Sequence, residues 1–346
     1  MQTEDKKRME IGKLTRISRC GRRSFIKGAL AAPLGIAATS LFQGCRKKGI
    51  RAETFIGKAD SYGVELASLI RDGLRELGID GNEIRGKRIL LKANIVEPHR
   101  GHEHIVTNPA VVAAAADAFL GMGAASIIVA EAPGHLRDTY RALEESGFDK
   151  IINHRGVSFA DLNYDDLWAT ANSGQTTNLS AFVFPSTLKQ VDWIVSMPKL
   201  KTHHWAGVTL SMKNLFGTLP GTFYGWPKNV LHNAGIDAAV FDINATLRPH
   251  FAIVDGIVGM EGDGPIMGTA KKAGVLVMGR NLPAVDATCA RVMGIDPYKI
   301  KYLAAADGKL GTIDASRIHQ RGENWRSVLT DFQLLDYIEA HRGLRL

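Results

Sequence analysis

The sequence predicts an α/β protein whose mostly parallel sheet is flanked by helices. From residue 51 onward, short apolar runs alternate with segments that carry apolar residues at helical spacing, and this alternation is typical of parallel sheets. The chain has 346 residues, 45% of them hydrophobic, which is enough to bury a large core. A single α/β unit with a long inserted middle section fits the pattern, and so do two lobes with a site between them.

Each predicted element follows from the local spacing of apolar residues. Helical spacing predicts helices over 64–77, 109–120, 139–146, 236–247, 283–293 and 300–306. Short apolar runs predict strands over 88–95, 125–130, 182–184, 191–197, 251–255 and 275–278. Polar segments, including 163–178, interrupt the alternation in the middle of the chain, and no internal repeat is present.

The net charge of +8 is concentrated at the N-terminus. Residues 1–50 contain 12 Lys and Arg against 3 Asp and Glu, which leaves 31 basic and 32 acidic residues in 51–346. The predicted folded part is therefore close to neutral, and this distribution argues against nucleic-acid binding.

The N-terminal residues resemble an export signal of the twin-arginine type. Arg22 and Arg23 precede Ser24 and Phe25, and the apolar stretch 29–42 is shorter than the roughly 20 residues that span a bilayer. We expect residues 1–50 to be a signal and linker that engages the twin-arginine export machinery, with residues 51–346 forming the α/β domain. A short membrane anchor or a plain basic tail is the alternative.

The sequence around Cys45 resembles a lipoprotein cleavage site, although Gln43 stands where a small residue is usual. We expect a periplasmic or cell-envelope protein that touches the membrane only through its signal or through a lipid at Cys45. Twin-arginine export often carries proteins that have already bound a cofactor. The other cysteines, Cys20 and Cys289, are too few for a disulfide framework or an iron–sulfur cluster.

Polar and glycine-rich segments follow the predicted strands at 94–104, 131–137, 198–213 and 255–268. Because the carboxyl ends of parallel strands meet at one edge of a sheet, we expect a ligand site there. The carboxylates and glycines of 255–268 are equally consistent with a plain succession of turns. The spacing matches neither a dinucleotide-binding loop, nor a phosphate-binding loop, nor an EF-hand.

Segment 198–213 is the strongest candidate for chemistry. It contains five cationic or titratable side chains, which are Lys199, Lys201, His203, His204 and Lys213. Such a cluster can bind an anionic ligand, and a lysine beside other cations loses its proton more easily and becomes a better nucleophile. The alternative is a solvated basic loop over Trp205.

Other histidines extend the candidate site. His135 follows a predicted strand and His232 follows an aromatic turn, and together with His203 they could supply a metal ligand and an acid–base pair. His99, His102 and His104 form a separate group, which predicts an alternative metal site in a loop.

Six motifs together resemble the bacterial and archaeal family called domain of unknown function 362, and the resemblance covers roughly residues 90–300. These motifs are KANIVEP at 92–98, TNPAVV at 107–112, MPKLKTH at 197–203, VTLSMKNLFGTLPG at 208–221, IVDGIVGMEGDGPIMG at 253–268 and LPAVDA at 282–287. The resemblance implies a fold and names no reaction.

A fainter resemblance is to the nickel-dependent lactate racemases. It is carried by His203, the pair at 206–207, Thr209, Lys213 and the Pro-Gly pair at 220–221, with further matches at His232 and at the Gly-His pair 134–135. It implies that Lys213 carries a nickel-pincer nucleotide and that His232 binds the nickel. It also implies that His135 and His203 exchange the proton of a substrate hydroxyl.

The chain departs from the racemase pattern at several points. Ser211 and Met212 stand where a glycine pair is expected, three extra residues separate Lys213 from Pro220, and the Asp-x-Thr-Arg-Pro segment is absent. A different cofactor, another metal or none therefore stays open. Lys199, Lys201 and Asn94 are further candidates for contacts to a cofactor.

Three functions follow from these observations. The first is an exported isomerase or oxidoreductase that acts on a small hydroxylated anion with a bound cofactor. The second is a lipoprotein that binds an anionic ligand without catalysis. The third is a divalent-metal hydrolase that uses Asp255 and the histidines of 99–104.

Overall fold

The computed structural model of the chain describes residues 49–134, 138–152 and 156–346, and these fall within one compact unit. Its main sheet has the strand order β12-β1-β11-β10-β7-β2-β3-β4, and β8 and β9 branch from β10. The strands are β1 (Ala52–Lys58), β2 (Arg88–Ala93), β3 (Ser126–Glu131), β4 (Val157–Asp161), β7 (Trp193–Met197), β8 (Lys199–His203), β9 (Gly207–Thr209), β10 (Phe251–Glu261), β11 (Thr269–Gly279) and β12 (Ile318–Gly322).

Most strand pairs in this sheet are parallel. Strands β10, β7, β2, β3 and β4 run in one direction, and β11 is antiparallel to both of its neighbours. A separate antiparallel pair, β5 (Leu167–Ala171) and β6 (Ala181–Pro185), forms within the inserted middle section. The predicted fold class is thus confirmed. The described residues form a single α/β unit with an inserted middle section and do not divide into two lobes.

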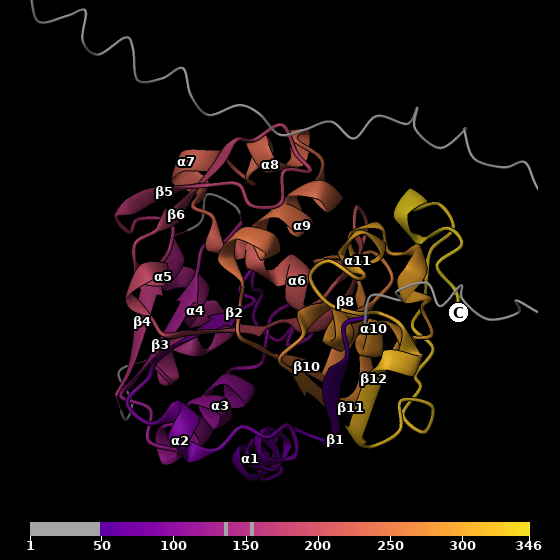
Figure 1. Cartoon of the computed structure of the whole chain (residues 1–346), viewed down its shortest axis with the longest axis horizontal. Helices are drawn as coiled ribbons and strands as arrows, with labels where there is room; N and C mark the ends of the chain where they lie inside the picture. The colour runs from indigo at the N-terminus through magenta and orange to yellow at the C-terminus, as the bar shows by residue number, and fades with distance from the viewer. Residues whose placement is uncertain (1–48, 135–137, 153–155) are drawn as a thin grey trace, which may run out of the picture. The chain divides into compact units, whose positions relative to one another are not determined.

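Helices cover both faces of the sheet (Figure 1). The helices are α1 (Leu66–Glu76), α2 (Gly81–Ile84), α3 (Pro109–Gly121), α4 (Thr139–Ser146), α5 (Thr187–Gln190), α6 (Ser211–Asn214), α7 (Gly221–Tyr224), α8 (Asn229–Asn233), α9 (Ile236–Leu247), α10 (Leu282–Val292) and α11 (Lys301–Ala306). In Figure 1, α1 to α3 lie below the strands, and α6 and α9 lie above them.

Alternation along the strands divides the core into two apolar clusters. Ile89 and Leu91 of β2 pack in the cluster that includes α1 and α3, whereas Leu90 packs in the cluster that includes α9 and α10. This is the period-two pattern of a strand that is buried on both faces. The sheet is therefore a rigid central layer whose carboxyl edge can hold side chains in fixed positions.

The structure extends two predicted strands and converts one predicted loop into strand. The strands expected over 251–255 and 275–278 continue as the long antiparallel pair β10 and β11, past a register shift between Gly256 and Val258. The segment after Pro198, expected as a loop, forms β8, which pairs with the extended part of β10. Glycines and charged residues concealed these strands, because they interrupt the apolar pattern that predicts one.

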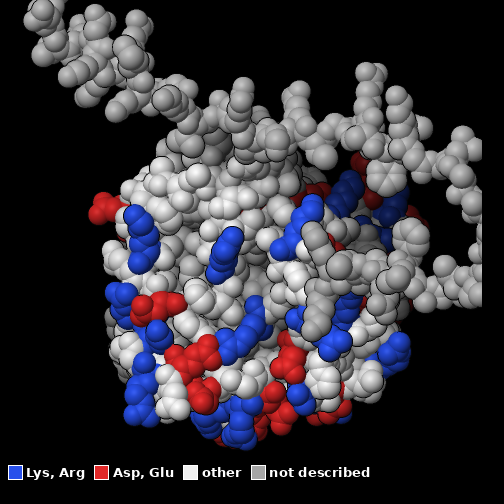
Figure 2. Space-filling model, in the orientation of Figure 1, with Lys and Arg blue, Asp and Glu red and all other residues white. Residues whose placement is uncertain are grey.

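Charged side chains of both signs are interspersed over the lower half of the face in Figure 2. None of the helices within residues 49–134, 138–152 and 156–346 is long and apolar enough to cross a membrane.

Candidate functional site

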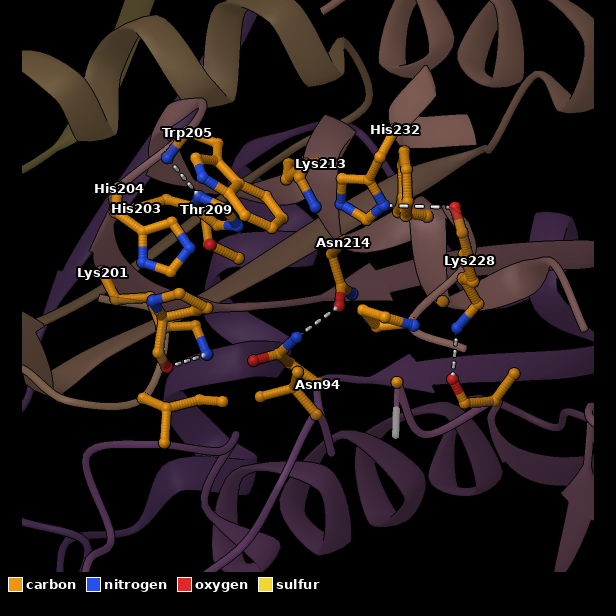
Figure 3. Close-up of a pocket in the computed structure, with 18 of the residues that line it drawn as sticks. Asn94, Lys201, His203, His204, Trp205, Thr209, Lys213, Asn214, Lys228 and His232 are labelled. Atoms are coloured by element: carbon orange, nitrogen blue, oxygen red, sulfur yellow. Dashed lines mark hydrogen bonds between the residues drawn. The ribbon is translucent and has the colours of Figure 1, made fainter. Parts of the chain in front are cut away.

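A cavity of about 260 Å³ lies at the carboxyl ends of β2, β3 and β8 (Figure 3). All four segments singled out in the sequence contribute to its walls, and α6 and the turn before α8 complete them. Among the described residues, the polar side chains of the lining are Asn94, Glu131, Lys201, His203, His204, Trp205, Thr209, Lys213, Asn214, Lys228 and His232.

The β8–β9 hairpin fixes the orientation of His203. Gly207 follows at a φ of 77°, a conformation that favours glycine, and lets the chain turn tightly into β9. The backbone N–H groups of Trp205 and Ala206 donate to His203 Nδ1 over 3.0 and 3.3 Å. Burial lowers the pKa of His203 well below its ordinary value. The imidazole is therefore neutral and carries its proton on Nε2.

Lys213 projects into the cavity from α6. Its ammonium lies 4.2 Å from the centre of the Phe216 ring, and no hydrogen bond joins Nζ to another described residue. Burial, followed by the charge of Lys228, lowers the pKa of Lys213 to about 7. At neutral pH a large fraction of this amine is therefore unprotonated and nucleophilic.

Asp286 of α10 holds the first turn of α6 in place. Its carboxylate is fully buried and accepts hydrogen bonds from the hydroxyl and backbone N–H of Ser211 and from the N–H of Met212. These two residues occupy the place of the glycine pair in the racemase pattern. Burial raises the pKa of Asp286 to about 7. Through this contact α10 sets the direction of the helix that carries Lys213.

Lys201 lines the cavity and Lys199 does not. Lys201 is fully buried and donates to the carbonyl oxygens of Ile105 and Pro265 over 2.7 and 3.1 Å. Lys199 lies outside the lining, where its ammonium forms a fully buried ion pair with Asp255 at 2.6 Å. Residues two apart on a strand lie on the same face, so the two lysines differ in their position along β8: Lys201, nearer the end of the strand, lines the cavity, and Lys199 pairs with Asp255.

His232 reaches the cavity from α8, directly after a buried turn. Its Nδ1 lies 3.1 Å from the backbone carbonyl of Lys228. Since a carbonyl oxygen can only accept, Nδ1 carries the proton and Nε2 keeps its lone pair. Burial lowers the pKa of His232. His203 and His232 are consequently neutral imidazoles of opposite tautomer on one cavity.

Lys228 is a cavity residue that sequence reasoning missed. Its side chain is buried, and Nζ donates to the carbonyl of Ala132 over 2.7 Å. Burial lowers its pKa to about 8. The residue sits at a φ of 69° in a proline-containing turn that has no periodic pattern. Only the three-dimensional structure brings it to the site.

Glu131, at the end of β3, supplies the only carboxylate among the described lining residues. Its Oε2 lies 2.8 Å from Lys92 Nζ, and both side chains are buried. The N–H groups of Ile95 and Ala132 donate to the same carboxylate over 2.8 and 2.9 Å. The negative charge of Glu131 is thus already balanced by Lys92, which lies behind the lining.

Asn94 presents an unsatisfied oxygen to the cavity. Asn214 donates through Nδ2 to the carbonyl of Lys92 and to Ser196, so its Oδ1 must face Asn94 Nδ2, 3.3 Å away. Figure 3 shows this contact, with the Asn94 oxygen turned away from Asn214. Asn94 Oδ1 and Thr209 Oγ1 are buried without a hydrogen-bond partner among the described residues. Such atoms favour a bound ligand.

The described residues among the remaining candidates are not brought into this arrangement. His135 lies outside the described residues. Among the residues that the structure does describe, no three His, Cys, Asp or Glu side chains are placed to hold a metal ion together, and this includes the histidines of 99–104. Asp255, which the hydrolase hypothesis requires, is instead paired with Lys199. The described residues therefore give the hydrolase interpretation no support.

Comparison with known protein families identifies the family to which the chain belongs. The model for the Domain of unknown function (DUF362) matches residues 89–291, more than half of the sequence. The chain belongs to the DUF362 family. Every described residue that lines the cavity falls inside the matched range. The candidate site is therefore built within the DUF362 region, and the residues after 291 lie outside it.

One related protein and two solved structures are similar to this DUF362 chain. The Thylakoid-associated protein sll1697 of Synechocystis sp. is 28% identical over 258 residues, which cover 72% of this chain and 77% of the relative. A structural-genomics protein from Thermotoga maritima has 13% identity and a TM-score of 0.36 over 64% of this chain and 58% of its own. The lactate racemase apoprotein from Thermoanaerobacterium thermosaccharolyticum has 14% identity and a TM-score of 0.37 over 65% and 54%.

Proposed function

We propose that this DUF362 protein is an enzyme of the isomerase or oxidoreductase type that binds a small hydroxylated anion in the lysine-lined cavity. The observation that supports this most directly is the state of Lys213. Its amine is buried in the cavity, lacks a hydrogen-bond partner among the described residues and has a pKa lowered to about 7. Perturbed amines of this kind are typical of catalytic sites.

The two neutral imidazoles suit proton transfer in opposite directions. The free Nε2 of His232 can accept a proton from a substrate hydroxyl, and the Nε2 hydrogen of His203 can be donated to a developing negative charge. Lys213 can act as a base in its neutral form or stabilise an oxyanion in its charged form. The cavity thus holds an acid and a base on one side of the molecule.

The donor set also fits a nickel-pincer nucleotide. An amine that loses its proton near neutral pH and an imidazole with a free Nε2 line the same cavity, which are the attachment and the ligand that such a group requires. When bound, the group would supply a hydride acceptor. With Lys213 and His232 holding the group, His203 would be the described cavity residue left to transfer the substrate's hydroxyl proton, and Lys201 and Lys228 would bind the anion.

Intact-mass and metal analysis of protein purified from its native host tests this cofactor. The proposal expects an added mass on Lys213 and stoichiometric nickel, and the Lys213→Met variant should lose both. Protein with an unmodified Lys213 and no nickel would exclude the covalent nickel cofactor and leave the anion site to be tested separately.

The activity itself is tested by following the loss of enantiomeric purity of small hydroxy acids by chiral chromatography. A panel of single enantiomers of such acids and of their phosphate esters should be epimerised by the native-host protein. We expect Lys213→Met and His232→Gln to lower the rate by at least about a hundredfold, the ordinary contribution of an acid–base group. The exposed Lys272→Gln should retain the wild-type rate. Tight binding without epimerisation would favour the alternative, a ligand-binding protein without catalysis.

We further propose that residues 1–50 direct export and that the protein works in the periplasm or cell envelope. Replacing both Arg22 and Arg23 by lysine should leave the precursor in the cytoplasm, because the twin-arginine pathway reads that pair. Fractionation measures this outcome, and a Cys45→Ser variant tests lipid attachment. Export that persists without the arginine pair would contradict the assignment.

A further inference from the structure

Three buried lysines lie one after another in space along the cavity. Lys201 lies at one side in Figure 3 and Lys228 at the other, with Lys213 between them. Burial lowers the pKa of Lys201, and the charges of Lys199 and then Lys213 lower it further; burial and then the charge of Lys228 lower the pKa of Lys213. The cavity therefore presents cationic groups at two ends and a third near its centre.

Among the described residues, neither end lysine forms an ion pair of its own, and Glu131 acts on both only at longer range. Lys201 donates to two carbonyl oxygens and Lys228 to one, and these contacts satisfy N–H groups without balancing charge. Glu131, the one carboxylate among the described lining residues, is already paired with Lys92. Burying an ammonium without a counter-ion is costly, which is why burial lowers the pKa values of both lysines, and an anion that enters would favour their charged forms and supply the balance.

We propose that the ligand is an elongated dianion with one acidic group at each end, either carboxylate or phosphate. One group pairs with Lys201 and the other with Lys228, so that the atoms between them face Lys213. This inference rests on the proposed function in taking the cavity as the substrate site. It adds the number of charges on the substrate and their placement.

The unsatisfied atoms of the cavity agree with an uncharged group between the two ends. Asn94 Oδ1 can accept a hydrogen bond, and Thr209 Oγ1 can donate or accept one. A middle portion that carries a hydroxyl would satisfy the Asn94 oxygen. A third acidic group beside Asn94 would be repelled by it.

Calorimetric titration of the full chain tests the number of charges. The probes are succinate and glutarate as dicarboxylates, 2-phosphoglycolate as a molecule with a carboxylate at one end and a phosphate at the other and a net charge of about −3 at neutral pH, and butyrate as a monoanion of similar length. The dianions should bind at least about tenfold more tightly than butyrate, because only they pair with both ends. Comparison of succinate with 2-phosphoglycolate then shows whether one end prefers phosphate.

Two variants test the ends separately. Lys228→Gly removes the amine but keeps the backbone carbonyl that orients His232, and glycine tolerates the φ of 69° at this position. Lys201→Met keeps most of the buried stem. Each variant should weaken dianion binding by about tenfold or more and reduce the dianion preference to under about threefold. The exposed Lys272→Gln should bind like the wild type.

The outcomes separate this inference from the proposed function. Equal affinity of the wild type for butyrate and the dianions would overturn the dianion inference alone, and so would a dianion preference that survives in Lys228→Gly. Failure of the wild type to bind any of these acids would overturn the anion site and the inference together. If Lys201→Met does not fold, the binding data of Lys228→Gly alone test the inference, because glycine keeps the backbone conformation observed at position 228.

Discussion

His232 donates its Nδ1 hydrogen to the backbone carbonyl of Lys228, 3.1 Å away and four residues earlier in the chain. The same lysine sends its ammonium to the carbonyl of Ala132 at the end of β3. One buried turn thus fixes the tautomer of an imidazole and places an amine on the same cavity. The arrangement leaves His232 Nε2 unprotonated, as a base or a metal ligand requires.

The lowered pKa of Lys213 predicts selective chemical modification. With a pKa of about 7, roughly half of the amine is unprotonated at pH 7, whereas an ordinary lysine is almost fully protonated. Limited reductive methylation at pH 7, followed by peptide mapping, should modify Lys213 well before the exposed Lys272. The rate at Lys213 should fall about tenfold per pH unit below pH 7. Equal rates at the two lysines would show that the amine is not perturbed.

The same group predicts a pH dependence of stability. The pKa of Lys213 is lowered from 10.5 to about 7 on folding, so between these values the unfolded chain holds a proton that the native protein lacks. Raising the pH across this window therefore favours the native state, by up to about 1.4 kcal/mol per pH unit. Below about pH 7 both states hold the proton, and the dependence disappears.

Urea denaturation of the wild type and of Lys213→Met at pH 7, 8 and 9 measures this effect. The difference between the two free energies of unfolding should change in favour of the wild type as the pH rises. Taking the difference removes the contribution of the titrating groups that do not depend on the charge of Lys213, and leaves that of Lys213 and of the groups it acts on, such as Lys201. A difference that stays constant over this range would contradict the lowered pKa.

The elements with strong periodicity were predictable from the sequence. The helices expected over 139–146 and 236–247 are the observed α4 and α9, because their apolar faces and caps lie in the local sequence. Strand β8 was not predictable. Its lysines and histidine are typical of a solvated loop, but here Lys201 is buried against residues 105 and 265 and Lys199 against Asp255, all far away in sequence.

The candidate site was only partly predictable, for the same reason. Asn94, Lys201, His203, Lys213 and His232 were found because each follows a predicted strand or belongs to a motif. Two groups that decide the electrostatics, Lys228 and the ion pair of Lys92 with Glu131, depend on long-range contacts. Neither a Glu at the end of a strand nor a Lys in a turn has a sequence pattern that predicts a role in the electrostatics of the cavity.

Asp286 is predicted to support the site through α6. Asn at this position would keep the size but place an amide NH₂ against the N–H of Met212, leaving a buried donor unsatisfied. We expect Asp286→Asn to lower the free energy of unfolding by about 2–3 kcal/mol and to weaken anion binding. Asp80 also caps a short helix but is exposed, and Asp80→Asn should cost less than about 0.5 kcal/mol. If Asp286→Asn and Asp80→Asn lowered the free energy of unfolding equally, the contact of Asp286 with α6 would not be a special support of the site.

Gly217 is predicted to be required beside the buried ion pair. A Cβ at this position would collide with Glu131 Oε1 and would lie 2.7 Å from Lys92 Nζ. Neither side chain can move cheaply, because the carboxylate is held by two backbone N–H groups and by Lys92 itself. We expect Gly217→Ala to destabilise the protein by about 1–3 kcal/mol, the usual cost of overpacking.

Gly121→Ala is the matched control for this substitution. Gly121 ends α3, and a Cβ there would meet no atom within 4 Å, so the change should be neutral or stabilise the protein by up to about 1 kcal/mol. Thermal and urea denaturation of both variants compares the two sites. Gly217→Ala should also weaken anion binding, since Glu131 lines the cavity. A Gly217→Ala variant as stable as Gly121→Ala would show that the Lys92–Glu131 pair can shift without cost, and the cavity would then be less rigid than its hydrogen bonds indicate.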